Sequence, residues 1–353
     1  MFTEKFKNIS LGCFGCAGTF ALLFVICGIL VLIGFADTVF KNFRAEETNK
    51  VSFKYDPASL KEVYLSGFKE ITSRTPKIAV IRIKGVMVTD PDRSFGNYCD
   101  SRTVCLQIRR AAMDPSVKGV ILELDTPGGE VAAADAIYQE IASLRSQTRK
   151  SIAAMMNSMA ASGGYYIAAP CKPIVARNST LTGSIGVIIS TVNYSGLFSK
   201  LGLESEVYTS GGMKDMLNGA RKRTPGEVAI VRSLVEDSYS DFVRIVSVSR
   251  NIPSEVIRKG PIGDGRILSG RQALKLKLVD QLGTMQNALD AVVKNAGLQG
   301  KVFSVITYEE EFDLAKMADL LFSKVQPLKL SLHGSSSNFV PRSGVLYYLP
   351  HGL

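Results

Sequence analysis

Three short apolar runs, each leading into a glycine-containing turn, most constrain what this chain can fold into. They are KIAVIRIKGVM at 77–87, KGVILELD at 118–125 and SIAAMM at 151–156. After the second run, Ile137, Ile141 and Leu144 fall on one face of a helix predicted over 131–146. Strand, turn and helix repeating in this order indicate βαβ units. We therefore predict an α/β core.

Two further helices are expected on either side of this core. The segment PASLKEVYLSGFKEI at 57–71 is amphipathic and is predicted to be a connecting helix. At 224–250, Thr224 and Glu227 have capping-box spacing, and Pro225 occupies the first helical position. A long packed helix is predicted there, and its apolar face comprises Val231, Leu234, Val235, Ser238, Phe242 and Ile245.

The N-terminal segment indicates a membrane location. From Leu11 to Ala36 the chain runs for 26 residues without a charged side chain, and a spanning helix needs about 20. The alternative is a signal peptide cleaved near 34–36, but the apolar core of a signal peptide has only about 7 to 15 residues. We therefore predict an uncleaved single-pass anchor in the cell (inner) membrane. The short tail before it and the long chain after it favour an extracytoplasmic main domain.

The charge and the cysteine content limit which binding partners and which cellular compartment are expected. The net charge of +10 suits an anionic membrane surface. The basic residues are scattered and no aromatic RNA-binding signature or zinc spacing accompanies them, so nucleic acid is not an expected partner. Outside the apolar run, Cys99 and Cys105 either close a small disulfide loop, if the domain is extracytoplasmic, or remain free thiols.

One serine, Ser162, lies between two alanines and two glycines in MNSMAASGGYYIAAP at 156–170. Taken alone it is typical of a small packing residue, and as a nucleophile it would need a base. The two histidines, His333 and His351, lie in the loop-like tail, so a Ser-His-Asp triad is not expected. No zinc-binding or phosphate-binding motif occurs either, and we expect no metal or cofactor. The base must then be a lysine, a tyrosine or a carboxylate.

Lys214 is the candidate lysine, because glycines and methionines surround it in TSGGMKDMLNG at 209–219. A lysine becomes a base only when burial or a nearby cation lowers its pKa from about 10.4. The neighbouring Asp215 would have the opposite effect, so its carboxylate is expected to point away. Composition alone is more typical of a solvated loop lysine. Similarly, PGGE at 127–130 is either a plain turn or a source of N–H donors for an oxyanion.

Together these segments resemble a known family. DTPGGEV, MNSMAASGGYYIAAP, TLTGSIGVIIS and GGMKDML are similar, in this order, to motifs of the bacterial signal peptide peptidase A family in its short, single-module, membrane-anchored form. The likeness covers about 77–297, and the 52 residues from Ser162 to Lys214 match the family's spacing. The resemblance implies the fold of the crotonase and Clp protease group, a spiral of βαβ units.

By position, the resemblance makes Ser162 the nucleophile and Lys214 the general base of a serine endopeptidase. Ser184 would orient the lysine amine, and the N–H groups of Gly129 and Gly163 would form the oxyanion hole. The substrates implied are remnant signal peptides and other apolar peptides at the membrane. The resemblance also implies a homo-oligomer, in which neighbouring subunits could complete each other's sites.

The chain is expected to divide into four parts. These are a tail and anchor at 1–36, a linker with the amphipathic helix at 37–76, a protease domain at 77–300 and a C-terminal extension at 301–353. The tail from about 328 has loop composition, and its apolar patch VLYYLP is hypothesised to visit the substrate groove.

Three alternatives to this function stay open. The first is an acyl-CoA hydratase or isomerase of the same fold group, with Glu130 as its acid. The second is a non-catalytic membrane scaffold. The third is a sibling serine-lysine protease that acts on a membrane-protein partner.

Overall fold

The structure is a computed structural model, and it describes residues 56–67, 75–90, 97–310 and 347–348. All of these belong to one unit that begins at Tyr55. The predicted anchor at 1–36 lies outside the described residues. Within the described ranges, no helix is both long enough and apolar enough to cross a bilayer.

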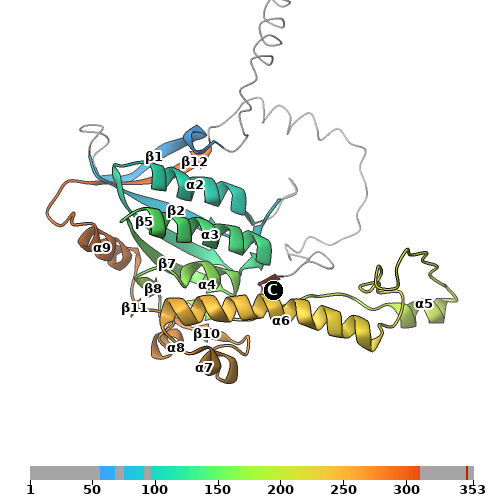
Figure 1. Cartoon of the computed structure of the whole chain (residues 1–353). Helices are drawn as coiled ribbons and strands as arrows, with labels where there is room; N and C mark the ends of the chain where they lie inside the picture. Colours follow the sequence, from blue (N-terminus) through green and yellow to red (C-terminus); the bar gives the residue numbers. More distant parts are fainter. Residues whose placement is uncertain (1–55, 68–74, 91–96, 311–346, 349–353) are drawn as a thin grey trace, which may run out of the picture. The chain divides into compact units, whose positions relative to one another are not determined.

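Nine of the described strands form one sheet (Figure 1). Their order is β1-β12-β2-β5-β7-β8-β11, with β9 beside β7 and β10 beside β9. The three predicted runs are the parallel neighbours β2, β5 and β7, which confirms the α/β class. The bounds are β1 Leu60–Gly67, β2 Lys77–Lys84, β5 Val117–Thr126, β7 Ser151–Ala161, β8 Ile174–Ala176, β9 Leu181–Gly183, β10 Ile267–Ser269, β11 Gln281–Leu282 and β12 Ser304–Glu310.

Helices cover both faces of this sheet (Figure 1). The helices α2, α3 and α4 lie over one face, and α9 packs against β5, β7 and β8 from the other. Alternate residues of each strand supply two separate cores, so that Leu122 and Leu124 of β5 enter the first and Ile121 enters the second. The helix bounds are α2 Ser101–Met113, α3 Val131–Gln147, α4 Gly163–Ala168, α5 Ser195–Leu201, α6 Pro225–Arg250, α7 Ser254–Lys259, α8 Gly270–Lys275 and α9 Met285–Asn295.

A smaller sheet has the strand order β13-β6-β3-β4. Gly85 ends β2 as predicted, because its φ of 86° turns the chain toward β3. The strand β13, which comes from the tail patch, pairs antiparallel with β6. The bounds are β3 Val86–Val88, β4 Tyr98–Asp100, β6 Gly129–Glu130 and β13 Tyr347–Tyr348.

The predicted long helix is α6, and its capping box forms between Thr224 and Glu227 as expected. The prediction that the whole helix packs is wrong. Phe242 and Ile245 in the C-terminal half are buried, whereas Leu234 in the N-terminal half is 41% exposed. The reason is visible in Figure 1, where α6 crosses below α4 and continues past the sheet toward α5.

The helix predicted at 57–71 is also wrong. The short 3₁₀ helix η1, Pro57–Ser59, is followed directly by the strand β1. Along β1 the register runs from Leu60 opposite Glu310 to Gly67 opposite Ser304 in the antiparallel strand β12. Val63 and Tyr64 suit a half-buried strand, and pairing with a segment about 240 residues away outweighs the local helical pattern.

Candidate active site

Ser162 occupies the junction between β7 and α4. Its φ of 53° and ψ of −115° are strained for a residue with a side chain, and such strain collects at functional sites. Its N–H donates to the Gly183 carbonyl at 2.8 Å, and its carbonyl accepts the first helical bond from Tyr166 N–H at 2.9 Å. The side chain is fully buried, yet its Oγ has no hydrogen-bond partner in the described part of the chain. The backbone is therefore fixed on both sides while the hydroxyl is left uncommitted.

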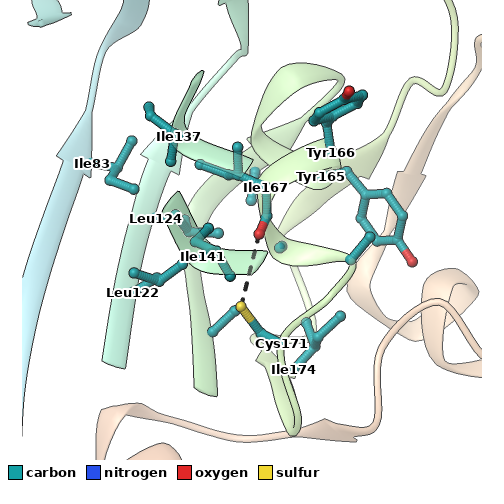
Figure 2. Close-up of a cluster of buried hydrophobic side chains, with 14 of the residues drawn as sticks. Ile83, Leu122, Leu124, Ile137, Ile141, Tyr165, Tyr166, Ile167, Cys171 and Ile174 are labelled. Atoms are coloured by element: carbon teal, nitrogen blue, oxygen red, sulfur yellow. Dashed lines mark hydrogen bonds between the residues drawn. The ribbon is translucent and has the colours of Figure 1, made fainter. Parts of the chain in front are cut away.

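The core holds α4 in place (Figure 2). The Tyr165 hydroxyl donates to the Leu278 carbonyl at 2.8 Å, and the Tyr166 hydroxyl donates to Asp135 Oδ1 at 2.9 Å. The Cys171 thiol donates to the Ile167 carbonyl at 3.8 Å, the dashed line of Figure 2. Burial raises the pKa of the Tyr165 phenol, so this tyrosine stays protonated. It therefore anchors α4 and does not supply a base.

The glycine turn at 126–130 meets the start of α4. The Gly128 N–H donates to Thr126 Oγ1 at 3.1 Å, and a Cβ at Gly164 would lie 2.9 Å from Thr126 Cγ2. Gly129 lies against β3, where a Cβ would fall 1.9 Å from the Met87 carbonyl oxygen. Only glycine fits there. Both expected oxyanion donors, Gly129 and Gly163, thus belong to segments that the fold brings into contact.

Ser184 is placed beside Ser162 by the same hydrogen bond that fixes the Ser162 backbone. It follows Gly183 directly, has a φ of 49° and is almost fully buried. Its N–H donates to the Arg266 carbonyl at 2.8 Å. Ser184 and Tyr239 of α6 both line a cavity of about 400 Å³. Sequence reasoning did not foresee the positive φ at either serine.

Lys214 lies on a different segment of the chain. It is exposed, and it lies in a turn within residues 187–224, which we call the arm (Figure 1). Its N–H donates to the Gly211 carbonyl at 3.0 Å, and no hydrogen bond or ion pair of the described residues joins it to Ser162. The Asp215 carboxylate forms an ion pair with Arg221, and within the described residues it forms none with Lys214. Sequence reasoning missed Arg221, although Asp215, Arg221 and Glu227 recur at intervals of six residues.

Glu130, next to Gly129, is held by a structural partner. Glu130 is buried, and its Oε2 accepts from both the N–H of Thr89 at 2.9 Å and the hydroxyl of Thr89 at 2.7 Å. Cys99 and Cys105 are free and buried, and burial raises the pKa of each thiol to about 12. In the described ranges, no three His, Cys, Asp or Glu side chains gather as a metal site would require.

Comparison with known proteins places the chain in a family. Residues 144–299 match peptidase family S49. A protein of Enterococcus faecium named signal peptide peptidase SppA is 36% identical over 254 residues, which cover 69% of this chain and 72% of that protein. The chain belongs to peptidase family S49. A protease of Synechocystis is 34% identical over 69% of this chain and 83% of its own length.

Some relatives of this chain are longer proteins. The chloroplastic serine protease SPPA of Arabidopsis thaliana is 31% identical over 65% of this chain but only 34% of its own length. The matched S49 region includes Ser162, Ser184 and Lys214. The protein is therefore a serine-type peptidase of the SppA group.

Proposed function

We propose that this S49 peptidase is a membrane-anchored endopeptidase with a serine-lysine dyad, which degrades remnant signal peptides and other apolar peptides. Ser162 is the nucleophile, Lys214 the general base, and Ser184 the group that orients the lysine. The N–H groups of Gly129 and Gly163 bind the oxyanion. The fold is that of the crotonase and Clp protease group, and the parallel strands β2, β5 and β7 with helices between them support this assignment.

In this mechanism the neutral Lys214 amine takes the proton from Ser162 as Oγ bonds to the substrate carbonyl carbon. The carbonyl oxygen becomes an oxyanion held by the two glycine N–H groups. The lysine ammonium then gives its proton to the leaving nitrogen as the peptide C–N bond breaks. Water, deprotonated by Lys214, attacks the acyl-enzyme, and the Ser162 oxygen leaves and recovers a proton.

The observation that carries the proposal is the uncommitted hydroxyl of Ser162 on a strained, fixed backbone. A packing serine gains nothing from a positive φ, and a buried hydroxyl without a partner costs stability. The surroundings suit a peptide substrate. The strand β13 pairs with β6 in the register Tyr347 opposite Glu130 and Tyr348 opposite Gly129. An extended peptide can therefore bind as an added strand beside an oxyanion donor.

Lys214 reaches Ser162, we propose, from a second copy of the chain. Within one copy, Arg221 links the turn that carries Lys214 to Glu227 at the start of α6. At 1.5 Å per residue, Glu227 lies about 22 Å along the helix axis from Phe242, where α6 enters the core. The arm also exposes large apolar side chains and α5 buries none of its residues, as expected of a surface that a partner covers. The most exposed are Val192 (75%), Leu197 (56%), Leu201 (61%), Leu203 (52%) and Tyr208 (91%).

The uncharged run at 11–36 supports a membrane anchor. We place the protein in the inner cell membrane with its peptidase domain outside the cytoplasm, where cleaved signal peptides lie within reach. Alkaline phosphatase fused after residue 60 tests the orientation. We expect the fused phosphatase to be active. An inactive fusion would indicate the opposite membrane topology and would leave the proposed dyad unaffected.

The alternatives gain less support. A hydratase would need a free acid near the oxyanion glycines, but the carboxylate of Glu130 is held by Thr89. A scaffold has no use for the strained serine. A sibling protease directed at a membrane protein would share every catalytic residue, so only the choice of substrate separates it from the proposed function.

Hydrolysis of an apolar fluorogenic peptide by the whole chain in detergent tests the dyad. We expect Ser162→Ala and Lys214→Ala each to abolish cleavage, and activity that survives either change would refute the assignment. Thermal unfolding of both variants shows whether the fold is intact. Comparing synthetic signal peptides with intact membrane proteins as substrates separates the proposed function from the sibling protease.

Mixing the two inactive variants tests the contribution of a second copy. If Ser162 and Lys214 act across subunits, a mixed oligomer contains some sites with both residues intact. We then expect part of the wild-type rate to return after the variants are mixed and allowed to exchange subunits. Crosslinking monitors the exchange. A mixture that has exchanged but stays inactive would show that each site draws both residues from one copy.

A further inference from the structure

Arg221 joins two acidic side chains on the arm. Its guanidinium donates to both carboxylate oxygens of Asp215, Nη2 to Oδ1 at 2.6 Å and Nε to Oδ2 at 3.0 Å. It also donates to both oxygens of Glu227, Nη1 to Oε2 at 3.0 Å and Nη2 to Oε1 at 2.5 Å. Because the fork of N–H donors matches a carboxylate at two points, Arg221 fixes the position of both acids.

Glu227 anchors this network to the start of the helix α6. Its side chain is only 2% exposed, and its Oε2 also accepts from the Thr224 N–H at 2.7 Å. The Glu227 N–H in turn donates to Thr224 Oγ1 at 3.3 Å, which completes the capping box of α6. Arg221 is thereby attached to the first turn of a helix of 26 residues whose other half is packed in the core.

The other end of the network is the turn that carries Lys214. Asp215 follows Lys214 directly, and its carbonyl accepts from the Asn218 N–H at 2.8 Å and from Arg221 Nη2 at 3.4 Å. The Asn218 side chain adds a bond from Nδ2 to Asp215 Oδ2 at 3.4 Å. Both the backbone and the carboxylate of Asp215 are therefore held, and the position of Lys214 follows from that of Asp215.

The network also determines which side chain the Asp215 carboxylate pairs with. In the described part of the chain, no ion pair joins this carboxylate to Lys214, and Arg221 opposes its charge instead. The arm also carries the charged side chains Lys200, Glu204, Glu206, Lys222 and Arg223, and Glu227 in the first turn of α6 is paired with Arg221 as well. A free carboxylate beside an amine stabilises the ammonium, which cannot accept a proton from serine.

We propose that Arg221, anchored by Glu227, is a positioning residue for peptide hydrolysis: it fixes the turn that carries Lys214 and keeps the Asp215 carboxylate away from the lysine amine. This inference rests on the proposed function, in which Lys214 is the base. It explains how an acid next to the base is tolerated. It also explains why a side chain that touches neither Ser162 nor Ser184 should affect the rate.

The test is the pH dependence of kcat/KM for an apolar fluorogenic peptide, measured with the whole chain in detergent. In Arg221→Ala the freed Asp215 carboxylate favours the protonated amine. The pH of half-maximal kcat/KM is then expected to rise by about one unit, which lowers the rate at neutral pH about tenfold. Adding Asp215→Asn removes the freed carboxylate, so the double variant is expected to return the half-maximal pH to the wild-type value or below.

A purely structural role gives a different result. If Arg221 only stabilises the arm, Arg221→Ala lowers kcat/KM by the same factor at every pH and Asp215→Asn restores nothing, which would overturn the proposal. Wild-type rates in Arg221→Ala would overturn it as well. Arg244→Ala is the matched control, because Arg244 forms an exposed ion pair with Asp241 on α6 at 3.0 Å. It is expected to keep both the rate and the pH profile.

Two further variants keep the test decisive. If Arg221→Ala does not fold, Arg221→Lys retains the charge but cannot bind both carboxylates at two points, and an intermediate rise of the half-maximal pH is expected. If Arg221→Lys keeps both the wild-type rate and the wild-type pH dependence of kcat/KM, the two-point binding by the guanidinium is not required, and the proposal fails. Lys214→Ala separates this inference from the proposed function. If Lys214→Ala is inactive while Arg221→Ala behaves as wild type, only the positioning role fails, and an active Lys214→Ala removes the dyad itself.

Discussion

Phe242 of α6 packs edge-on against Tyr166 of α4, with ring centroids 5.1 Å apart and ring planes inclined at 67°. This contact joins the long helix to the short helix that begins after Ser162. Phe242 is fully buried, and the Tyr166 hydroxyl is bonded to Asp135 of α3. The position of Ser162, the proposed nucleophile, therefore depends on packing between three helices as well as on the sheet.

Phe242→Ala should be one of the most destabilising single changes in the domain. Removing a buried phenyl ring costs about 3–5 kcal/mol, part of it from the cavity left behind. We also expect peptidase activity to fall, because Tyr166 loses the ring that holds it. Denaturant unfolding followed by tyrosine fluorescence measures the loss of stability. Val248→Ala on the same helix is the control, since Val248 is 78% exposed and its loss should stay within about 0.5 kcal/mol. Equal losses in the two variants would contradict this account.

Gly129→Ala is expected to damage both stability and catalysis. The added Cβ would meet the Met87 carbonyl oxygen at 1.9 Å, so β6 must move away from β3. Overpacking of this kind costs about 1–3 kcal/mol. Displacement of the proposed oxyanion donor is expected to lower kcat about 10²- to 10³-fold. Thermal unfolding and peptide hydrolysis measure the two effects.

Gly196→Ala in α5 provides the matched comparison for stability, because nothing lies within 4 Å of its added Cβ. Its unfolding midpoint should equal or exceed that of the wild type. If Gly129→Ala unfolds at the wild-type temperature and keeps its activity, the close approach of β6 to β3 has no importance for the site.

Local patterns predicted the elements that depend on neighbours in sequence. Ile137, Ile141 and Leu144 of α3 are buried as their spacing indicated, and the capping box at Thr224 forms. The strand β1 was missed because its partner β12 is distant in sequence, and distant pairing leaves no local pattern.

The site itself was predicted only in part. The sequence marked Ser162 and Ser184 by resemblance, but their positive φ angles follow from tertiary contacts with Gly183 and Arg266. The 52-residue spacing between Ser162 and Lys214 says nothing about their distance in space. Within the described residues of one copy, no hydrogen bond or ion pair joins them, and no pattern of hydrophobic residues could have shown that half of α6 would lie outside the core.

The pairing of Arg221 with Glu227 predicts an acid-sensitive stability. Hydrogen bonds from Arg221 lower the pKa of Glu227 to about 2, below the value of about 4.3 of an unfolded chain. The stabilisation is therefore complete above pH 5 and is lost as the pH falls toward 2. Glu227→Gln keeps the capping box but removes the charge. We expect its thermal midpoint to lie below that of the wild type at pH 7.

The difference between the two midpoints should shrink as the pH falls and should vanish near pH 2. Calorimetry at pH 7, 5, 3.5 and 2.5 follows this trend. Lys259→Gln controls for general charge effects, since its ion pair with Glu255 on α7 is exposed on both sides. A wild-type advantage over Glu227→Gln that stays constant from pH 7 to 2.5 would mean that the charge of Glu227 contributes nothing.

Cys99 and Cys105 should be unreactive free thiols in the folded protein. Both are buried, and burial raises the pKa of each to about 12, so only about 0.01% is thiolate at pH 8. Iodoacetamide should leave both unmodified in the native protein and should label both after unfolding in guanidinium without reductant. Peptide mapping by mass spectrometry distinguishes them from the other four cysteines, Cys13, Cys16, Cys27 and Cys171. A crosslinked peptide that contains Cys99 and Cys105 would establish a disulfide instead.

The pairing of β13 with β6 predicts that the tail competes with substrate. Tyr348 lies opposite Gly129, so an occupied edge excludes a peptide from the same strand position. If the tail occupies the edge of β6 in half of the molecules, its removal lowers KM about twofold. If the tail occupies this edge in a larger fraction of the molecules, the decrease in KM is larger. Truncation after residue 340 tests this with the fluorogenic peptide.

A synthetic peptide SGVLYYLP should inhibit the truncated enzyme. The same peptide with proline at the position of Tyr347 should inhibit it less, because proline donates no N–H to the neighbouring strand. Unchanged kinetics after truncation, together with no inhibition by either peptide, would show that the tail does not use the substrate edge.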